Sequence, residues 1–395
     1  MTISIRIKEW MEQSSWIRRM FEEGMVLKAE YGEENVFDFT LGNPDLEPPF
    51  LFSETLQKVM GEKKMGKHGY MPNAGYPETR KAIADYLSQE HQDEISEKQV
   101  IMTCGAGGGL NVVLKTLLNP GEEVITPVPY FVEYFFYVNN HGGNLKLVKT
   151  KSDFSLDLSE IEKAVSPKTK AIIVNSPHNP TGKVYDERSL KELGELLRKK
   201  SSEMGNTIYL ISDEPYGKII YDDISLPSIF KIYEHSILVT SYSKELSVPG
   251  ERIGFVAVSP HATPQEDLLE GMVFCNRTLC FVNAPALMQR VVRHLQGISV
   301  DVSFYQKRRD LLCDNLASLG YQFVKPQGAF YLFPRTPIGD DVAFVKELQV
   351  EHILTVPGSG FGMPGFFRIA YCVDEKVIRR SLKGFKKVAE KYFHS

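Results

Sequence analysis

The sequence predicts an α/β fold, in which a mostly parallel central sheet lies between two layers of helices, with a smaller α+β domain built from both chain ends. Three observations predict it. Through the middle of the chain, short β-branched runs alternate with helical patterns, which is typical of strand–helix–strand units. The two ends instead combine helical patterns with short runs typical of antiparallel strands. The 395 residues are enough for about two or three domains.

The central sheet is predicted from seven short apolar runs. They cover residues 100–104, 123–126, 145–149, 170–175, 208–213, 236–241 and 255–259. Helical patterns lie between them, for example at 110–118, 131–139 and 189–200. Several of the predicted strands end at Gly, Pro, Asn or Asp. Because ligands bind outside the carboxyl ends of parallel strands, we expect a functional site at these ends.

The chain ends predict the smaller domain. Residues 1–34 have a polar helical pattern that ends near the turn at Gly32. From about residue 301, a charged helical pattern leads to the runs YQFVKP, QGAFYLFP and FFRIAYC and then to a basic C-terminal helix. We therefore predict a large domain over residues 45–295 and a small domain over residues 1–44 and 296–395.

Composition and charge exclude several classes of protein. Lys and Arg number 46 and Asp and Glu 50, and this net charge of -4 argues against a nucleic-acid partner. No apolar run reaches the roughly 18 residues of a membrane span, and the N-terminus lacks the apolar core of a signal peptide. The five cysteines include no CxxC pair, which favours reduced thiols. We expect a cytoplasmic protein with no membrane partner and no metal site.

A glycine-rich segment, CGAGGGL, lies between a predicted strand and a predicted helix at residues 104–110. Glycines let backbone N–H groups approach an anion closely, and the N-terminus of a helix favours negative charge. The segment fails the dinucleotide-binding fingerprint because Leu110 stands where that motif has Gly or Ala. A tight turn without a ligand remains the alternative.

The segment SYSK (241–244) follows another predicted strand. Lys244 should lie at the edge of the sheet, where burial would lower its pKa and make its amine a nucleophile towards an aldehyde. Arg252 comes eight residues later. Together with the hydroxyls of Ser241 and Ser243 and the glycine-rich helix start, these cations predict a phosphate site. The alternative for Lys244 is a solvated loop lysine.

Two further motifs follow strands. In SDEPY (212–216), Asp213 would end a buried strand, where a carboxylate needs a cationic partner such as a protonated pyridine nitrogen. The alternative is an aspartate that caps a helix or belongs to a turn. In NSPHNPTG (175–182), the prolines and glycine fix a turn that presents Asn179. The alternative there is a turn without a ligand.

Taken in order, these motifs resemble a known family. The set comprises LGNPD, GYMPNAG, the glycine-rich segment, HNPTG, SDEPY, SYSK with Arg252, and GAFYLFP with FRIA. It is similar to the fold-type-I pyridoxal-phosphate-dependent aminotransferases of class I/II over about residues 15–390. The resemblance implies pyridoxal 5'-phosphate as cofactor and a homodimer with active sites at the interface.

The resemblance also implies a role for each matching residue. Lys244 matches the lysine that forms the internal aldimine and moves the Cα proton, and Asp213 matches the carboxylate at the pyridine nitrogen. The implied contacts to the cofactor ring come from Tyr216, Asn179 and Phe131, and those to its phosphate from Gly105, Ala106, Gly107, Ser241, Ser243 and Arg252. Tyr70 would reach the phosphate across the dimer interface, with Asn283 nearby. Arg368, Gly42 and Asn179 would bind the substrate carboxylate.

The implied reaction is transamination from an L-amino acid to a 2-oxo acid, with 2-oxoglutarate expected and ping-pong kinetics. A C–S β-lyase on the same fold is the alternative enzyme. A cofactor-sensing regulator is a third possibility, but the leading residues are too few for a DNA-binding module.

The sequence leaves open which amino acid donates the amino group. Gly107 stands where related bacterial aspartate aminotransferases often carry a lysine. Arg277 or Lys28 could bind a second carboxylate, or solvent could surround them. Several aromatic residues could shape an apolar substrate pocket or belong to the core: Phe37, Phe39, Phe330, Tyr331 and Phe361.

Overall fold

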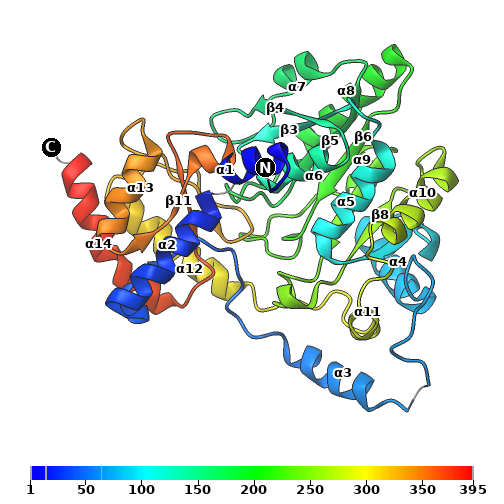
Figure 1. The fold of residues 1–395 in the computed structure, drawn as a ribbon, viewed down its shortest axis with the longest axis horizontal. Coiled ribbons are helices and arrows are strands. Elements are labelled where there is room, and N and C mark those ends of the chain that lie inside the picture. The colour runs from blue at the N-terminus through cyan, green and yellow to red at the C-terminus, as the bar shows by residue number, and fades with distance from the viewer. Residues whose placement is uncertain (1, 14–15, 64, 394–395) are drawn as a thin grey trace.

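The computed structural model describes residues 2–13, 16–63 and 65–393. A seven-stranded sheet forms the centre of the larger part of the molecule (Figure 1). Its strands, in spatial order, are β2 (Val100–Thr103), β8 (Gly254–Val258), β7 (Ser236–Ser241), β6 (Tyr209–Asp213), β5 (Thr169–Asn175), β3 (Glu123–Val128) and β4 (Asn144–Lys149). The strands from β7 to β4 are parallel, and β8 runs antiparallel to both of its neighbours. This confirms the predicted fold class.

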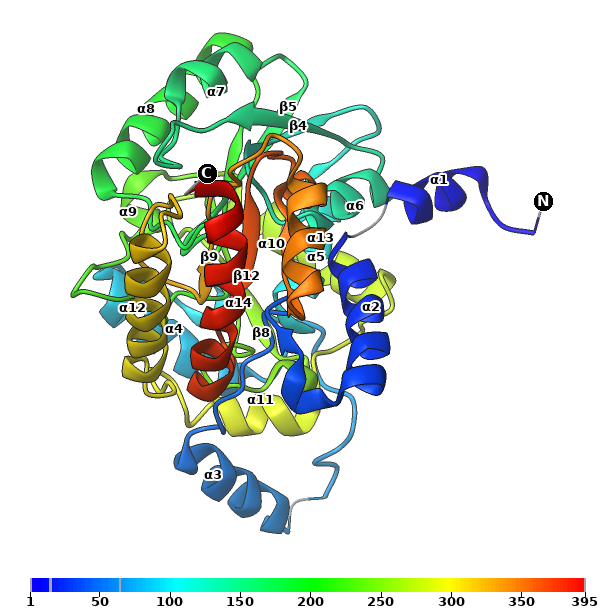
Figure 2. The same cartoon turned by 90° about the vertical axis from the view of Figure 1, so that its left-hand side faces the viewer.

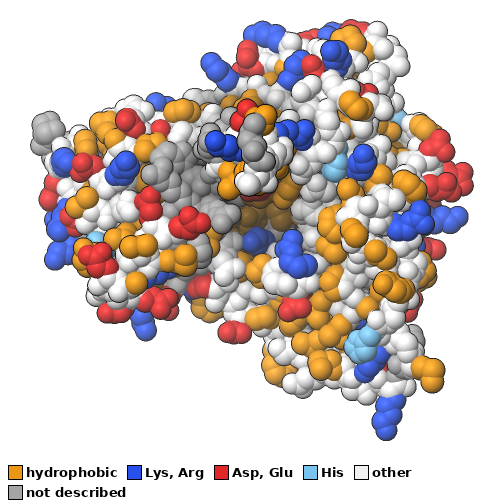
Figure 3. All heavy atoms as spheres, viewed as in Figure 1, with side chains coloured by type: hydrophobic (Ala, Val, Ile, Leu, Met, Phe, Trp, Pro, Cys, Tyr) orange, Lys and Arg blue, Asp and Glu red, His pale blue; other side chains and the backbone are white. Residues whose placement is uncertain are grey.

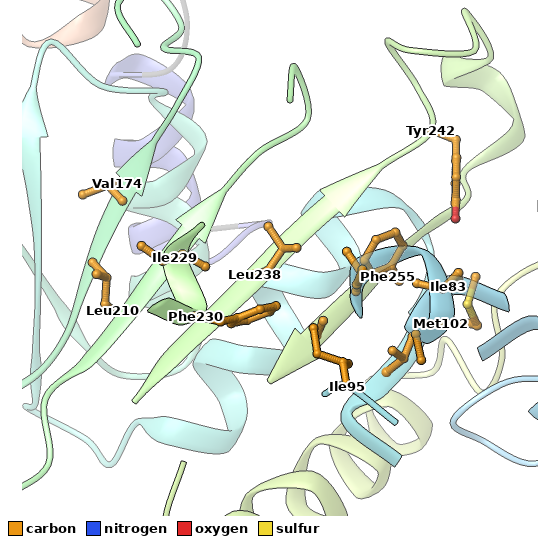
Figure 4. Packing of buried hydrophobic residues seen from close by; sticks show 14 of the residues in the cluster. Ile83, Ile95, Met102, Val174, Leu210, Ile229, Phe230, Leu238, Tyr242 and Phe255 are labelled. Carbon is orange, nitrogen blue, oxygen red and sulfur yellow. The ribbon is translucent and has the colours of Figure 1, made fainter. Parts of the chain in front are cut away.

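Helices cover both faces of the sheet because its strands are apolar on both sides. On one face, strand residues such as Ile173 and Ile211 pack with α5 (Gly105–Leu117), α6 (Glu133–Asn140) and α10 (Gln265–Thr278). On the other face, the alternate strand residues pack with α4 (Pro77–His91), α7 (Leu158–Ala164), α8 (Glu187–Met204), α9 (Ile229–Ile232) and α11 (Ala286–Val292). Figure 4 shows this second cluster, in which Val174, Leu210 and Leu238 come from neighbouring strands. Burial on both faces is typical of parallel sheets.

A second, smaller part is built from both chain ends. Figure 2 shows its helices grouped together. They are α2 (Trp16–Tyr31), α12 (Ser303–Ser318), α13 (Asp341–Val350) and α14 (Glu375–Phe393). They share one apolar cluster with strand residues, and this cluster includes Met20 of α2, Ile378 of α14 and Phe39 just after the first strand. The cluster on the sheet face includes Leu295, and the small-part cluster includes Val300. The division at residues 45 and 295 stays a prediction.

The strands of the small part are short. The antiparallel set has the order β11 (Val356–Pro357), β12 (Phe367–Ala370) and β9 (Tyr331–Leu332). A separate parallel pair joins β1 (Phe37–Asp38) to β10 (Ile353–Leu354). The run 321–326, which we grouped with the antiparallel strands, forms no strand. Its backbone makes single contacts instead: Gln322 O accepts from the Arg335 N–H, and Pro326 O accepts from the Arg309 side chain.

Two helices lie at the periphery. In Figures 1 and 2, α3 (Phe50–Gly61) stands away from the body. In Figure 2, α1 (Ile5–Gln13) projects to one side, and its Trp10 contacts the rings of Phe135 and Phe136 on α6. Short 3-10 turns cover Glu33–Asn35, Glu97–Gln99, Pro249–Glu251 and Gly358–Phe361. Among the helices in the described ranges, none is both long and apolar enough to cross a membrane.

Candidate active site

A cavity of about 320 Å³ lies at the carboxyl ends of β5, β6 and β7, where they face β9 and β12 of the small part. Figure 3 shows this side of the molecule hollowed between the part that carries α2 and α13 and the part that carries α5, with Lys or Arg side chains at the hollow. All of the predicted site residues line the cavity except Gly105 and Tyr70. The predicted site residues therefore lie together at the carboxyl edge of the sheet, as the strand pattern predicts.

Lys244 follows β7 by three residues and points into the cavity. Its Nζ donates a hydrogen bond to Gly42 O at 2.8 Å. Burial lowers the pKa of the lysine to about 8, and the positive charges of Arg252 and Arg368 act in the same direction. Part of the amine is therefore neutral near neutral pH, as a nucleophile requires. The solvated loop lysine that sequence alone left open is wrong.

Asp213 is the last residue of β6, and its side chain is 4% exposed. The Tyr134 hydroxyl donates to its Oδ2 at 2.5 Å, whereas Oδ1 has no hydrogen-bond partner within the described ranges. Burial raises the pKa of Asp213 to about 7, and the bond from Tyr134 opposes that rise. A cationic N–H donor at Oδ1 would satisfy the free oxygen and hold the carboxylate ionised. Asp213 does not cap a helix, because the chain continues to α9 only at Ile229.

An anion site lies at the start of α5. The glycine-rich segment is the first turn of this helix rather than a loop before it, since the helix begins at Gly105. Gly105 has a φ of +70°, and a Cβ there would lie 3.1 Å from a guanidinium nitrogen of Arg252. Glycine thus lets the guanidinium approach the unpaired N–H groups of the first turn. The hydroxyls of Ser241 and Ser243 line the same end of the cavity. This set suits a phosphate.

Arg368 lies on β12 and is 2% exposed. It donates to Asn179 Oδ1 at 3.0 Å and to Thr40 O at 2.5 Å, while its Nε finds no acceptor in the part of the chain that the structure describes. The rings of Tyr331 and Phe361 each lie 4.7 Å from the guanidinium carbon. A buried guanidinium that faces a cavity with a free N–H suits a carboxylate ligand.

The remaining predicted residues surround the middle of the cavity. The backbone N–H of Asn179 donates to Asn175 Oδ1 at 2.7 Å, and Asn175 in turn donates to Asp213 O at 2.8 Å. Phe131 meets the ring of Tyr134 edge to face, with centroids 5.5 Å apart. These bonds tie the turn after β5 to the end of β6. Asn179 is thereby fixed beside Arg368.

Three polar lining residues were not assigned a polar role from sequence: Tyr137, Asn175 and Tyr331. Neither was Tyr134, which donates to Asp213 from behind the lining. Tyr134 and Tyr137 lie three and six residues after Phe131, a helical spacing that could have placed them on one face. Tyr331 drew attention only as an aromatic residue. Its hydroxyl hydrogen-bonds to that of Tyr216 at 2.7 Å, a contact that no local pattern indicates.

Several other candidates lie outside the cavity. Tyr70 is 92% exposed and borders a separate groove with Asn283, so its predicted role depends on a second subunit. Lys28 pairs with Asp38 at 2.7 Å, and Arg277 lies over the Phe274 ring on α10. Of the aromatic set, Tyr331 lines the cavity, while the others belong to or pack on the core: Phe37, Phe39, Phe330 and Phe361. The core alternative is correct for those phenylalanines.

An α/β fold that holds a buried lysine, a free carboxylate oxygen and an anion site at one strand edge defines the class of enzymes that handle amino acids with pyridoxal phosphate. The chain belongs to the family of aminotransferases of class I and II, whose model matches residues 34–385. It is therefore an aminotransferase of amino-acid metabolism, from a family that depends on pyridoxal phosphate. The predicted resemblance is confirmed.

Known relatives match nearly the whole chain. The probable aspartate aminotransferase of Methanocaldococcus jannaschii is 34% identical over 360 residues, covering 89% of this chain and 92% of the relative. The probable aspartate/prephenate aminotransferase of Aquifex aeolicus is 32% identical over 90% of this chain and 91% of its own. The crystal structure of an amino transferase from Eubacterium rectale is 38% identical, with a TM-score of 0.96 over 99% of both chains.

Proposed function

We propose that the protein moves the amino group of an L-amino acid to a 2-oxo acid, with pyridoxal phosphate bound in the cavity and attached to Lys244. The observation that carries this proposal is the placement of Lys244, Asp213 and Arg368 around one cavity. Asp213 and Arg368 each keep a buried polar atom without a partner among the described residues. Such atoms are costly unless a ligand satisfies them.

The residues around the cavity fit this cofactor. Asp213 Oδ1 is free to accept a hydrogen bond from a protonated ring nitrogen. The phosphate would be held by the first-turn N–H groups of Gly105, Ala106 and Gly107, and by Ser241, Ser243 and Arg252. Tyr216 and Asn179 would donate to the ring oxygen, and Phe131 would cover the ring face.

Bound pyridoxal phosphate supplies an electron sink that makes the Cα–H bond of an amino acid acidic. The residues of the chain do the rest. Arg368 binds the α-carboxylate of the substrate through its free Nε and orients the Cα towards Lys244. Because the pKa of Lys244 is lowered to about 8, its Nζ can accept the proton that leaves the Cα. Asp213 holds a proton on the ring nitrogen.

A homodimer and a cytoplasmic location are parts of the same proposal. Large apolar side chains along residues 50–70 face outward, among them Phe50, Met65 and Tyr70. Such exposure is typical of a subunit interface, and a second subunit would bring its Tyr70 to the phosphate. All five cysteines are free, which favours a reducing compartment.

We propose 2-oxoglutarate as one amino acceptor and leave the donor to experiment. The relatives named above carry aspartate or prephenate in their names. The cations among the described lining residues are Lys244, Arg252 and Arg368, and each already has a role. An aspartate donor would therefore need a cation from a second subunit. Donors with uncharged side chains need none.

The test combines mapping with kinetics. Borohydride reduction of the loaded protein, followed by peptide mass mapping, should place the cofactor on Lys244. Removing a positioned base costs roughly 10²–10⁴-fold in rate, so K244A should lose at least that much and all covalent label. The matched control is K200A, since Lys200 lies outside the cavity and pairs with Glu162 and Glu203 on the surface. A cofactor found on another lysine would refute the proposal.

A screen of single L-amino acids with 2-oxoglutarate then identifies the donor by the glutamate formed. The alternative on this fold is a C–S β-lyase. If cystathionine gives pyruvate, ammonia and a thiol while no donor yields glutamate, the lyase is the correct function.

A further inference from the structure

Tyr331 lies between two groups that we have assigned to different ligands. Its hydroxyl is 2.7 Å from the Tyr216 hydroxyl, which faces the cofactor ring in the proposed function. Its ring lies 4.7 Å from the guanidinium carbon of Arg368, which binds the substrate carboxylate in the same proposal. Tyr331 is 2% exposed and lines the cavity itself. One side chain thus contacts both halves of the site.

Strand register creates this double contact. β9 pairs antiparallel with β12, so that Tyr331 is opposite Ala370. Arg368 precedes Ala370 by two residues and projects from the same face of the sheet. Diagonal neighbours of this kind are close enough for an aromatic ring and a long side chain to meet. The ring of Tyr216 adds an edge-to-face contact, with centroids 5.6 Å apart.

The number of hydroxyl hydrogens limits the hydrogen bonds that Tyr216 and Tyr331 can donate. Each tyrosine hydroxyl has one hydrogen to donate. If Tyr216 donated to Tyr331, it would have none left for a ligand in the cavity. Tyr216 can donate into the cavity only when its oxygen accepts from Tyr331 instead. The 2.7 Å contact allows that direction.

We propose that Tyr331 is a positioning residue with two separable effects: its hydroxyl donates to Tyr216 and aims the Tyr216 proton at the cofactor ring oxygen, and its ring holds the Arg368 guanidinium in place for the substrate carboxylate. The inference rests on the proposed function, which assigns Tyr216 and Arg368 to those ligands.

The packing around the hydroxyl fixes its position. A Cβ on Gly42 would overlap the Tyr331 hydroxyl, so glycine lets the tyrosine lie directly against the backbone there. The carbonyl of the same glycine accepts the bond from Lys244 Nζ. Tyr331 is therefore packed against the segment that orients the lysine. Its hydroxyl has Tyr216 as the partner within reach.

The two effects predict different outcomes for two variants. Y331F removes the hydroxyl and keeps the ring over Arg368. Tyr216 then becomes a weaker donor, so the ring oxygen of the bound cofactor becomes more basic. The midpoint of the pH-dependent absorbance change of the holoenzyme should rise by about 0.5–1 pH unit, the equivalent of one ordinary hydrogen bond. The KM of the donor that the wild type converts best should change by less than about twofold, since the cation–π contact is intact.

Y331L removes both effects. Its absorbance midpoint should rise as in Y331F, and its KM for the donor should also rise by about 5- to 30-fold, the range expected for a desolvated cation–π contact. The matched control is Y371F. Tyr371 is also buried in the small part, and its hydroxyl meets another tyrosine hydroxyl, that of Tyr221, at 3.4 Å, away from the cavity lining. Both readouts should match the wild type in this control.

Each result supports or overturns one of the two effects of Tyr331. A Y331F holoenzyme that titrates like the wild type overturns the role of the hydroxyl, and a KM raised equally in Y331F and Y331L overturns the role of the ring. In either case a wild type that transaminates normally leaves the proposed function standing. A wild type that binds no pyridoxal phosphate overturns the proposed function, and the inference falls with it.

Discussion

Replacing Asp213 with asparagine should make the cofactor-free protein more stable while it abolishes activity. Burial raises the pKa of Asp213 from its ordinary value of 3.8 to about 7. Between these two values the folded protein holds a proton on this carboxyl that the unfolded chain has lost. Folding stability therefore falls as the pH rises from about 4 to about 7, and stays low above that. Asparagine carries no charge, so D213N does not lose this stability as the pH rises.

The size of the effect follows from the shift of about three pKa units. At 1.36 kcal/mol per unit, the raised pKa of Asp213 costs the cofactor-free protein about 4 kcal/mol at pH 8 and about 1–2 kcal/mol at pH 5. The free-energy difference between D213N and the wild type should therefore grow by about 2–3 kcal/mol from pH 5 to pH 8. Subtracting the two proteins removes the contributions of titrating groups that do not interact with Asp213. Glu214 does interact with it: burial raises the pKa of Glu214 to about 8, and the charge of Asp213 adds to that rise.

The assay is urea unfolding of both cofactor-free proteins at pH 5, 6, 7 and 8, at one protein concentration. D223N serves as the control, because Asp223 is exposed and its replacement should leave no pH-dependent difference. Saturating pyridoxal phosphate should stabilise the wild type more than D213N, since D213N keeps Lys244 and the phosphate site but lacks the partner of the ring nitrogen. A difference that stays flat from pH 5 to pH 8, or a D213N protein less stable than the wild type at pH 8, would refute the reasoning.

The structure predicts the outcome of three further substitutions. Y134F removes the donor to Asp213, so the pKa of the carboxyl should rise further and the affinity for pyridoxal phosphate should fall by about 10- to 100-fold in equilibrium dialysis. G42A places a methyl group against the Tyr331 hydroxyl and should lower kcat by about 10- to 100-fold in steady-state assays, with an unchanged circular dichroism spectrum. L238A opens a cavity beneath the sheet and should cost about 2–5 kcal/mol in urea unfolding, because Leu238 is buried in β7.

For each of these three substitutions, one result would contradict the prediction. Gly61 has open space around it, so G61A is the control for G42A, and equal kinetics in both would contradict the clash. Unaltered cofactor affinity in Y134F would mean that the hydroxyl does not support the carboxylate. A loss below about 1 kcal/mol in L238A would contradict close packing at that position.

Much of the fold could be predicted from local pattern alone. The seven predicted strands match the observed ones to within two residues at each end, because apolar β-branched runs flanked by turn residues leave few other ways to bury those side chains. The start of α5 could not be predicted, because glycine is a poor helix former and the helical pattern of the sequence began only at Leu110. Contacts of this helix with β7 and β8 offset that low propensity.

The motifs also predicted most of the candidate site. Lys244, Asp213 and Asn179 each follow a strand closely, and parallel strands bring their carboxyl ends to one edge. Tyr70 is different, because its place in the site depends on a second subunit that no local pattern specifies.

By itself, the sequence determined the strands, the edge where the chemistry gathers, and the family. The tertiary structure alone decided which side chains complete the site. Tyr134 meets Asp213 across 79 residues of chain, Tyr331 meets Tyr216 across 115, and Arg368 meets Asn179 across 189. The last two pairs depend on how β9 and β12 lie against the central sheet, and the first depends on how α6 covers it. Hydrophobic periodicity records which face of an element is buried, but it carries no information on which distant element covers that face.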